Sequence, residues 1–422
     1  MHWFGEWSME SGSGTGFSKV SPQHSSSTES NEPVESSFGD VVDLVNRRSE
    51  ALVLANGRNR ASIAVWPAMQ GRVLCSSPEG MDGRAFGWVN HELISSGERL
   101  KQVNAVGGED RIWLGPEGGQ FSLFFAPGVP FHLDHWNTPA PLDTEPFEIV
   151  DLRDDRVLFT RSFEVLNYSG SKFQVRINRQ VRLLKEEAIW AGLKLNRKGR
   201  GKVVGFESDN ELSNLGSTAW SKESGLISLW VLGQFQATSR TSIILPIRPG
   251  SVAELGVAVT SDYFGAVPEE RISVRADSVL FRADGNCRSK LGLSSRRSRG
   301  MLGSYDAITR VLTIVQFSQS DEDAEYVNSA WRLQEEPYRG DVANCYNDGP
   351  SYPGGSQLGK FYELESSSPA IELKPGGSVS HVQRTIHLSG SEDELDQVSM
   401  ATLGVHLEDA LTLTGLSAEP RR

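Results

Sequence analysis

The sequence predicts an all-β protein, and three observations point to that class. Short runs of alternating or continuous apolar residues, each ended by Gly, Asn, Asp or Pro, fill the chain between about residues 50 and 390. No long helical pattern separates these runs. No Pro-rich linker and no fixed-period repeat divides the region. We therefore expect one large sandwich or barrel of antiparallel strands over residues 40–390.

Individual strands are expected where β-branched and aromatic residues cluster. A continuous apolar run, such as residues 226–232, is typical of a strand that is covered on both faces. The expected strands are residues 51–54, 62–66, 121–125, 173–177, 226–232, 242–247, 254–259 and 311–317.

The first residues of the chain differ in composition from the rest. Residues 8–38 are rich in Ser, Gly, Glu and Pro and hold few apolar side chains. Such a segment cannot bury enough apolar surface to offset its ordering entropy, so residues 1–39 are predicted to form a disordered leader. The start has neither a basic segment nor an apolar run of signal-peptide type, and no stretch has the roughly 18 apolar residues of a membrane span. A cytoplasmic protein without a membrane partner is the default expectation.

Two short helices are expected at the ends of the folded region. Apolar residues in the segment 41–45 follow Asp40, which is placed to cap an amphipathic helix. Ser391 and Glu394 have the spacing of a capping box, in which each side chain satisfies a free backbone N–H. They predict a C-terminal helix to about residue 403, within a helix and tail that span residues 391–422.

Charge and cysteine content exclude several classes of protein. The net charge of −12 argues against a nucleic-acid partner, because binding to a phosphate backbone depends on clustered Lys and Arg. The three cysteines lie far apart, without the spacing of a zinc site or a disulfide framework. The composition gives no indication of the oligomeric state.

Two Gly-flanked segments hold the residue types that could do chemistry. Residues 104–120 contain several glycines and one proline among charged and aromatic side chains, and glycines let a ligand approach the backbone closely. A β-bulge and a turn would explain this segment equally well. Residues 344–350 lead into the segment 361–370, which reads as a strand.

That late strand places two carboxylates together. Its period of two puts Glu363 and Glu365 on one face, roughly 6.5 Å apart along the chain. Two neighbouring carboxylates tend to raise the pKa of one of them, which suits acid and base catalysis. Solvent-facing glutamates on an edge strand are the alternative interpretation.

The segment that follows, residues 371–388, predicts a half-buried strand. Val382, Ile386 and Leu388 alternate with the polar residues at 381, 383, 385 and 387. One apolar and one polar face follow from this alternation.

Together these segments resemble the galactose mutarotase-like superfamily, also called aldose 1-epimerase-like. The chain is most similar to a bacterial family of unassigned function within that superfamily. The resemblance covers residues 50–390 and implies a large antiparallel supersandwich. It is carried by residues 107–111, 113–119, 346–350, 361–365 and 368–370, with further similarity at 70–73, 262–265, 303–306 and 326–329.

The resemblance also implies catalytic roles. In mutarotases of this fold a Glu on a late strand, followed by a Pro and a Leu-x-Pro-Gly turn, removes the proton of the anomeric hydroxyl, while a His protonates the ring oxygen. By this match Glu365 is the candidate base and Glu363 the alternate. Trp220 stands where the acid His is expected, and indole has no proton to donate near neutral pH. His381, His132 and His135 are other candidate acids, although a lone His is more often structural.

A set of polar and aromatic residues is expected to bind the sugar. Tryptophan rings can pack against the apolar C–H face of a pyranose, and Trp136 is a further candidate for this. The candidate substrate-binding residues are Arg111, Trp113, Glu117, His132, Trp220, Asn347 and Asp348. No metal or other cofactor is expected, although calcium could be held by Glu109, Asp110, Glu117 and Asp348, because hard cations prefer carboxylate oxygens.

These observations lead to one functional hypothesis and two rivals. The protein is expected to bind a neutral saccharide in a concave sheet pocket, with epimerase-like proton transfer at or near the anomeric carbon. A lyase or hydrolase that uses the paired carboxylates is the second catalytic reading. A non-catalytic sugar-binding or scaffold protein, in which Trp220 replaced the acid, is the alternative from another class.

Overall fold

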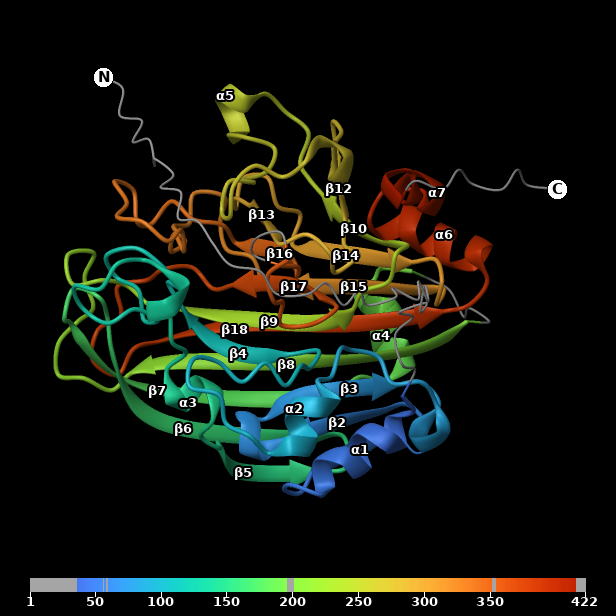
Figure 1. Ribbon diagram of the computed structural model, residues 1–422, viewed down its shortest axis with the longest axis horizontal. Helices are drawn as coiled ribbons and strands as arrows, with labels where there is room; N and C mark the ends of the chain where they lie inside the picture. The colour runs from blue at the N-terminus through green and yellow to red at the C-terminus, as the bar shows by residue number, and fades with distance from the viewer. Residues whose placement is uncertain (1–35, 56, 58–59, 196–200, 351–353, 415–422) are drawn as a thin grey trace, which may run out of the picture. The chain divides into compact units, whose positions relative to one another are not determined.

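The computed structural model describes residues 36–55, 57, 60–195, 201–350 and 354–414. Its strands form three antiparallel sheets (Figure 1). The three-stranded sheet has the order β1 (Leu52–Ala55), β2 (Ser62–Trp66), β3 (Arg72–Ser77). The five-stranded sheet has the order β13 (Ser289–Leu293), β16 (Ala343–Asn347), β17 (Phe361–Ser367), β9 (Ser228–Gln236), β4 (Arg111–Gly115).

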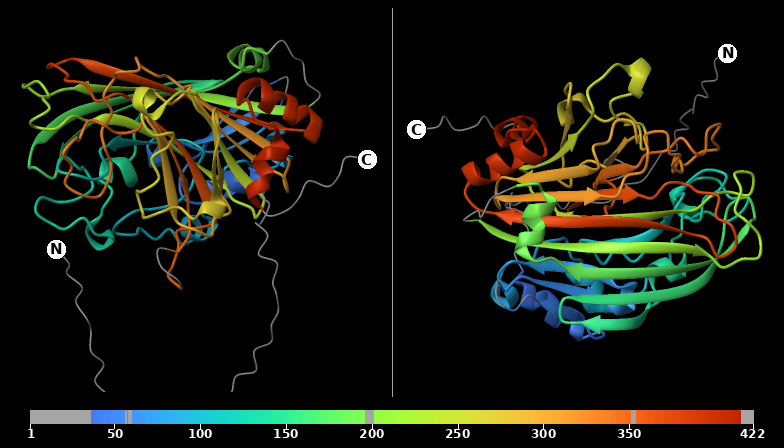
Figure 2. Two further views of the ribbon diagram at one scale, coloured as in Figure 1. Left: turned by 90° about the horizontal axis from the view of Figure 1, so that it is seen from above. Right: turned by 180° about the vertical axis from the view of Figure 1, so that it is seen from behind.

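The largest sheet in the described part of the chain has ten strands. In this sheet the long strands β18 (Ser378–Ser389), β8 (Lys202–Asn214), β7 (Lys172–Leu183) and β6 (Arg156–Leu166) lie side by side over much of their length (Figure 2). Its order is β11 (Ile272–Val274), β12 (Ser278–Arg282), β10 (Thr241–Pro246), β14 (Met301–Asp306), β15 (Val311–Phe317), β18 (Ser378–Ser389), β8 (Lys202–Asn214), β7 (Lys172–Leu183), β6 (Arg156–Leu166), β5 (Glu148–Arg153).

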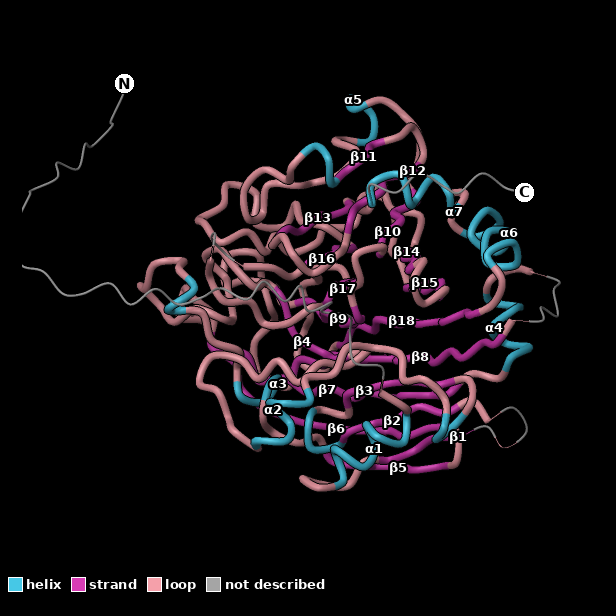
Figure 3. Tube along the Cα trace, turned by 45° about the vertical axis from the view of Figure 1, so that its right-hand side comes forward, coloured by secondary structure: helices cyan, strands magenta, loops and turns pink. Residues whose placement is uncertain are grey.

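Short helices lie around the outside of these strands (Figure 3). Leu395 and Val398 of α6 join the apolar cluster on the outer face of the ten-stranded sheet, and Phe38 and Val45 of α1 pack on β2 and β3. No helix in the described residues is both long and apolar enough to cross a membrane. The α-helices are α1 (Phe38–Asn46), α2 (His91–Ser96), α3 (Ala140–Asp143), α4 (Glu186–Gly192), α5 (Val252–Leu255), α6 (Glu392–Thr402) and α7 (Leu407–Ala410). The 3-10 turns are η1 (Pro67–Met69), η2 (Gly80–Asp82), η3 (Leu133–His135), η4 (Glu269–Arg271) and η5 (Leu411–Thr414).

The core lies between the ten-stranded sheet and the two smaller sheets. At one end Phe159 of β6 and Phe206 of β8 share an apolar cluster with Val231 of β9. At the other end Phe281 of β12 packs in a cluster with Leu364 of β17. Because apolar side chains from facing sheets interdigitate, the molecule is the large antiparallel sandwich that the sequence predicts.

Most expected strands are present, but two are not. Residues 121–125 form turns, because Leu123 N–H donates to the carbonyl of Pro116 (3.1 Å) and the apolar side chains pack under a loop instead of joining a sheet. Residues 254–259 begin in α5, since Ser251 and Glu254 form a capping box that starts a helical turn. Local capping therefore overrides the alternating pattern at this position.

The two predicted terminal helices are found, with one change at the first. Ser37, and not Asp40, is the N-cap of α1, and Asp40 occupies the third helical position, where its carboxylate accepts from Ser37 N–H (3.0 Å). This helix lies two residues ahead of the expected boundary at residue 40. The expected leader otherwise lies outside the described residues. Ser391 and Glu394 form the expected capping box of α6.

Strand β18 is expected to be half-buried, but its polar face is buried as well. His381, Gln383, Thr385 and His387 are all buried, because this face of the strand lies against the two smaller sheets. Each histidine has hydrogen-bond partners there: His381 contacts Ser366 (2.7 Å) and His387 contacts Glu109 (2.8 Å). The strand is covered on both faces, and its two histidines are hydrogen-bonded inside the sandwich.

Candidate functional site

The candidate site lies on the face of the five-stranded sheet that is turned away from the ten-stranded sheet. Alternate residues of β17 divide between the two faces: Tyr362 reaches Ser304 of β14 (2.7 Å), so Glu363 and Glu365 point the other way. The register places Glu363 opposite Gln234 of β9. The floor of the site therefore consists of every second side chain of neighbouring strands.

A pocket of about 310 Å³ opens above this floor. Its walls are mainly aromatic, and charged side chains of both signs project into it. Trp113, Trp136 and Trp331 come from different segments, and Trp113 stands edge-on to Trp230 at 5.5 Å between ring centroids. The charged residues that line it are Arg111, Glu117, Arg288, Lys290, Asp348 and Glu363. Such a mixture of aromatic walls and a few polar groups is typical of a small-molecule site.

Glu363 is held at the pocket by an ion pair and lies in a dry environment. Arg111 donates to its carboxylate (2.7 Å), and both side chains are buried. The guanidinium of Arg111 lies over the ring of Trp113, 4.2 Å from its centroid. Burial raises the pKa of Glu363 to about 7. The positive charge of Arg111 opposes this shift, and the negative charge of Glu365 adds to it. This carboxyl group can therefore give or take a proton near neutral pH.

Glu365 lies beneath the pocket and does not line it. Lys290 and the indole N–H of Trp230 both donate to its Oε2 atom, each at 2.9 Å. Its Oε1 atom is buried without a hydrogen-bond partner among the described residues. Burial lowers the pKa of Lys290, but the carboxylates of Glu365 and Glu117 outweigh it, so the pKa is raised and the ammonium stays charged.

Two further carboxyl groups line the pocket. Burial raises the pKa of Glu117, with Lys290 opposing the shift. Burial also raises the pKa of Asp348, whose carboxylate accepts from Tyr346 Oη (2.7 Å) and from Gly359 N–H (2.9 Å). Perturbed carboxyl groups that gather in one pocket are typical of a functional site.

Five of the predicted site residues come together here: Arg111, Trp113, Glu117, Asp348 and Glu363. Glu365 lies directly below them. The two Gly-flanked segments and the late strand therefore converge on one pocket. The remaining four predicted residues, Asn347, His381, Trp220 and His132, do not line it.

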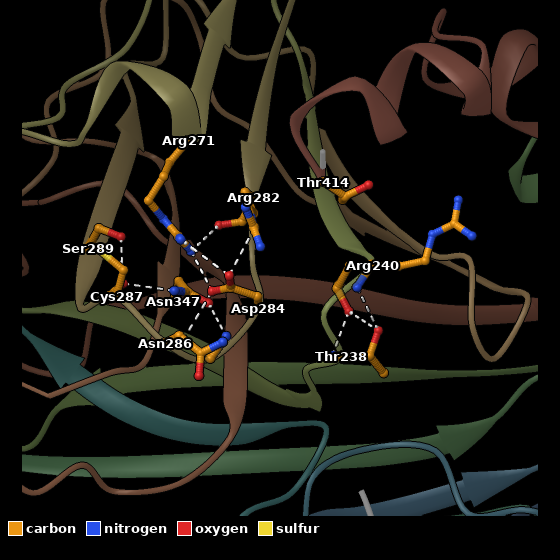
Figure 4. A network of polar contacts seen from close by, with 12 residues as sticks. Thr238, Arg240, Arg271, Arg282, Asp284, Asn286, Cys287, Ser289, Asn347 and Thr414 are labelled. Atoms are coloured by element: carbon orange, nitrogen blue, oxygen red, sulfur yellow. Dashed lines mark hydrogen bonds and ion pairs between the residues drawn. The ribbon is translucent and has the colours of Figure 1, made fainter. Parts of the chain in front are cut away.

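Asn347 serves the turn before β13 instead of the pocket (Figure 4). Its carbonyl oxygen accepts from Gly285 N–H (2.8 Å), and its amide group donates to the carbonyl of Cys287 (2.8 Å). Asp284 in the same turn is held by Arg271 and Arg282. With both ends of its amide occupied, Asn347 stabilises the turn that leads to Arg288 and Lys290.

The three other predicted residues lie elsewhere. His381 is buried on the inner side of β17, where it contacts Ser366, and burial lowers its pKa to about 3. Trp220 is buried against Phe173, with their rings 5.7 Å apart, and borders a separate hollow near the start of β7. His132 is exposed on a loop. These placements correct the expectation that either histidine shares a site with the paired glutamates.

The four carboxylates considered for calcium do not form one site. Glu109 bonds to Ser76 and His387, and Asp110 pairs with Arg179 (2.6 Å) inside the sandwich. Glu117 and Asp348 lie at the pocket instead. In the described part of the chain, no group of three or more His, Cys, Asp and Glu side chains is arranged to hold a metal ion.

Several pocket residues are not predicted from the sequence, above all Lys290 and Arg288. Lys290 occupies an alternating position on the short strand β13, opposite Tyr346 of β16, and its buried ammonium pairs with Glu365. A lysine amid the small and apolar residues of β13 is the one signal that could have indicated an inward charge. Trp230 lies within a continuous apolar run of the sequence, and only the structure shows that it faces the pocket.

Comparison with known proteins gives a family and a fold. Residues 36–413 match the family described as "Family of unknown function (DUF6786)". No curated protein matches the chain. The crystal structure of the Slr1438 protein from Synechocystis sp. PCC 6803 is similar at 12% identity and a TM-score of 0.50, with 81% of this chain and 97% of that chain covered.

The similar structures also include proteins of the superfamily that the sequence resembles. A galactose mutarotase related enzyme from Lactobacillus acidophilus has 10% identity and a TM-score of 0.43, covering 80% of this chain and 97% of that one. A galactose mutarotase-like protein from Lactobacillus casei ATCC 334 has 12% identity and a TM-score of 0.43, covering 80% and 99%.

Proposed function

The chain belongs to the DUF6786 family, and we propose that its aromatic pocket binds a saccharide with which Glu363 exchanges a proton. One observation carries the proposal. Glu363 lies at the pocket, paired with Arg111 at 2.7 Å, and its pKa is raised to about 7. A group that is partly ionised at neutral pH, and held in position by an ion pair, is suited to general acid and base catalysis.

The walls of the pocket suit a sugar ring. Trp113, Trp136 and Trp331 present aromatic surface to the cavity, against which the apolar C–H face of a pyranose can pack. Gln234 and Tyr346 supply neutral polar groups beside them. Sugar hydroxyls would hydrogen-bond to these groups and to the charged side chains, which fixes the orientation of the ring.

Epimerase-like proton transfer is the reaction that these groups support best. Glu363 as carboxylate takes the proton of the anomeric hydroxyl, while a protonated carboxylic acid donates a proton to the ring oxygen. The bond between the anomeric carbon and the ring oxygen then breaks, and an aldehyde forms. Closure on the other face returns both protons. Glu117 is the proposed acid, because burial raises its pKa and it lines the same pocket.

This assignment changes the order of the two glutamates that the resemblance implied. Glu365 is the expected base by sequence match, yet Lys290 and Trp230 occupy its Oε2 atom beneath the floor. We assign Glu365 the role of holding Lys290 in place at the pocket. Glu363 is the proposed catalytic residue.

A non-catalytic sugar-binding protein is the second candidate, and one observation favours it. No histidine is among the described residues that line the pocket, and Trp220 stands at the position where the resembling enzymes carry their acid. If no acid reaches the ring oxygen, the pocket would bind sugars without interconverting their anomers.

Two NMR measurements on the same samples separate these candidates. Saturation-transfer experiments with common hexoses and uronic acids would detect binding, and exchange spectroscopy would detect interconversion of anomers. We expect Glu363→Gln to lower the exchange rate about 100-fold or more, the usual contribution of a general acid or base. Glu336→Gln, at an exposed surface position, is the matched control and should leave the rate unchanged.

The outcomes discriminate clearly. Binding without anomer exchange in the wild-type protein would leave the sugar-binding protein as the function. Exchange that persists in Glu363→Gln would remove Glu363 as the catalytic residue. Absence of binding by every saccharide tested would overturn the whole proposal.

A further inference from the structure

We infer that the saccharide is acidic and that Arg288 binds its carboxylate group. This inference rests on the proposed function, because it names the chemical class of ligand for the same pocket. It departs from the neutral sugar that the sequence suggests. The charges that line the pocket, and the partners they already have, carry the argument.

Arg288 differs from the other two cations at the pocket. Arg111 is paired with Glu363 at 2.7 Å, and Lys290 is paired with Glu365 at 2.9 Å. Arg288 lines the same pocket, is only partly buried, and forms no ion pair with any described carboxylate. Its guanidinium therefore has hydrogen-bond donors left for a ligand.

The aromatic residues around Arg288 orient its side chain. Its guanidinium carbon lies 4.0 Å from the centroid of the Phe264 ring and 5.9 Å from that of Trp331. Stacking of this kind holds the plane of the guanidinium by its face and leaves the N–H groups at its edge free. A carboxylate can then accept two parallel hydrogen bonds from that edge.

The other charges at the pocket favour a carboxylate over a phosphate. Asp348 does not compete for Arg288 by a hydrogen bond, since its oxygens accept from Tyr346 and Gly359. A phosphate carries up to two negative charges and would need a second cationic partner. Arg111 and Lys290 cannot supply one, because each is already paired with a glutamate. Among the described residues that line the pocket, Arg288 is the one cation without an ion pair, and it matches one planar, singly charged group. A hexuronic acid, with a carboxylate on a pyranose ring, combines this group with the ring that the aromatic walls suit.

Calorimetric titration of the full chain with three ligands tests the inference. The ligands are D-glucuronate, D-glucose and D-glucose 6-phosphate, at one pH and one salt concentration. We expect glucuronate to bind about tenfold or more tightly than glucose, the usual effect of a charge-assisted hydrogen bond. Repeating the series with galacturonate and galactose separates this effect from the preference for one hexose.

Variants of Arg288 localise the effect. Arg288→Gln should weaken glucuronate binding about 10- to 100-fold and leave glucose binding within about twofold. Arg288→Lys keeps the charge but loses the forked geometry, and should fall between the two proteins. Arg332→Gln is the matched control, because Arg332 is exposed, does not line the pocket and contacts Asp262 only at 3.6 Å. If Arg288→Gln does not fold, as judged by its thermal unfolding, Arg288→Lys carries the test.

Each outcome has one meaning. Equal affinity for glucuronate and glucose, or an equal loss of both in Arg288→Gln, overturns the inference and leaves the proposed sugar pocket standing. Tighter binding of glucose 6-phosphate than of glucuronate overturns the carboxylate in favour of a phosphate. Failure of all the sugars to bind overturns the proposed function itself, and the inference with it.

Discussion

The two faces of β17 place ionisable groups under opposite conditions, although both faces are buried. On the pocket face Glu363 and Glu365 keep Arg111 and Lys290 as cationic partners. On the inner face Ser366 meets His381, which is shielded from water and has no ionic partner in the described residues. Burial raises the pKa of Glu363 to about 7 and lowers that of His381 to about 3.

The difference shows that burial alone does not decide whether a group is charged. Desolvation favours the neutral form on both faces. On the pocket face the nearby cations oppose it, so that Glu363 titrates near neutrality. On the inner face nothing opposes it, and His381 remains a neutral hydrogen-bonding residue. The chemistry that the site can perform therefore depends on Arg111 and Lys290 as much as on the glutamates.

Removing a cation from the pocket face should have the largest effect on stability. Lys290→Met keeps the apolar stem but leaves Glu365 as a buried carboxylate without an ionic partner. We expect a loss of about 3–5 kcal/mol in the free energy of unfolding, measured with denaturant. The double variant Lys290→Met/Glu365→Gln should recover most of the loss, since neither charge remains. A loss below about 1 kcal/mol in the single variant would show that the pair is not sealed from water.

On the inner face, His381 should make the protein sensitive to acid. The unfolded chain binds a proton near the ordinary pKa of 6.5, whereas the folded protein resists it down to about 3. Stability from this group is therefore present above pH 6.5 and is lost as the pH falls. Relative to His381→Asn, the wild-type protein should lose roughly 2 kcal/mol between pH 6.5 and pH 5. Parallel stability curves for the two proteins in that window would contradict a buried neutral His381.

On the pocket face, Glu363 should give a pH dependence of opposite sign. Its folded pKa of about 7 lies above the ordinary value of 4.5, so the folded protein binds the proton more tightly than the unfolded chain. Stability from this group is present below pH 4.5 and is lost as the pH rises toward 7. The wild-type protein should lose about 1–2 kcal/mol relative to Glu363→Gln between pH 5 and pH 6.5. A stability difference that grows with pH instead would mean that Arg111 dominates over burial.

The smallest expected effect comes from the neutral hydrogen bonds of the inner face. Ser366 donates to Gln383 (2.6 Å) and accepts from His381 (2.7 Å), which leaves the other ring nitrogen of His381 to accept from Ser318. Ser366→Ala should cost about 1 kcal/mol in unfolding free energy, the usual value for a buried neutral hydrogen bond. Saccharide affinity should not change, because Ser366 points away from the pocket. A change in affinity without a change in stability would link the two faces of β17.

Much of the candidate site could be predicted from local sequence patterns. The alternation in residues 361–365 requires Glu363 and Glu365 to share a face, because side chains on a strand alternate. The Gly-flanked segment before Pro116 could be recognised as a place where charged and aromatic residues gather. The strands at residues 62–66 and 311–317 followed from the same kind of reasoning, as did the capping box at Ser391.

Other features could not be read from local patterns. The segments 121–125 and 254–259 have apolar residues that suit a strand. The first instead forms turns held by backbone hydrogen bonds, and the second begins in a helix that starts with a capping box. Arg288 and Lys290 carry no motif, and their importance arises from partners that are distant in the chain. Asn347 stands next to Asp348 in an apparent binding motif, yet its side chain points to a turn.

The sequence by itself determined the all-β class, most strands, the capping box of α6 and the pairing of the two glutamates, because each of these depends on residues within a few positions of one another. Only the tertiary structure decided which glutamate lines the pocket, which pocket cation forms no ion pair within the described residues, and that the polar face of β18 is buried. Those properties depend on which strands become neighbours and which face is covered by another sheet. Burial and charge pairing are set by contacts across the whole chain, so the same alternating pattern yields a pocket wall on one strand and a neutral interior on another.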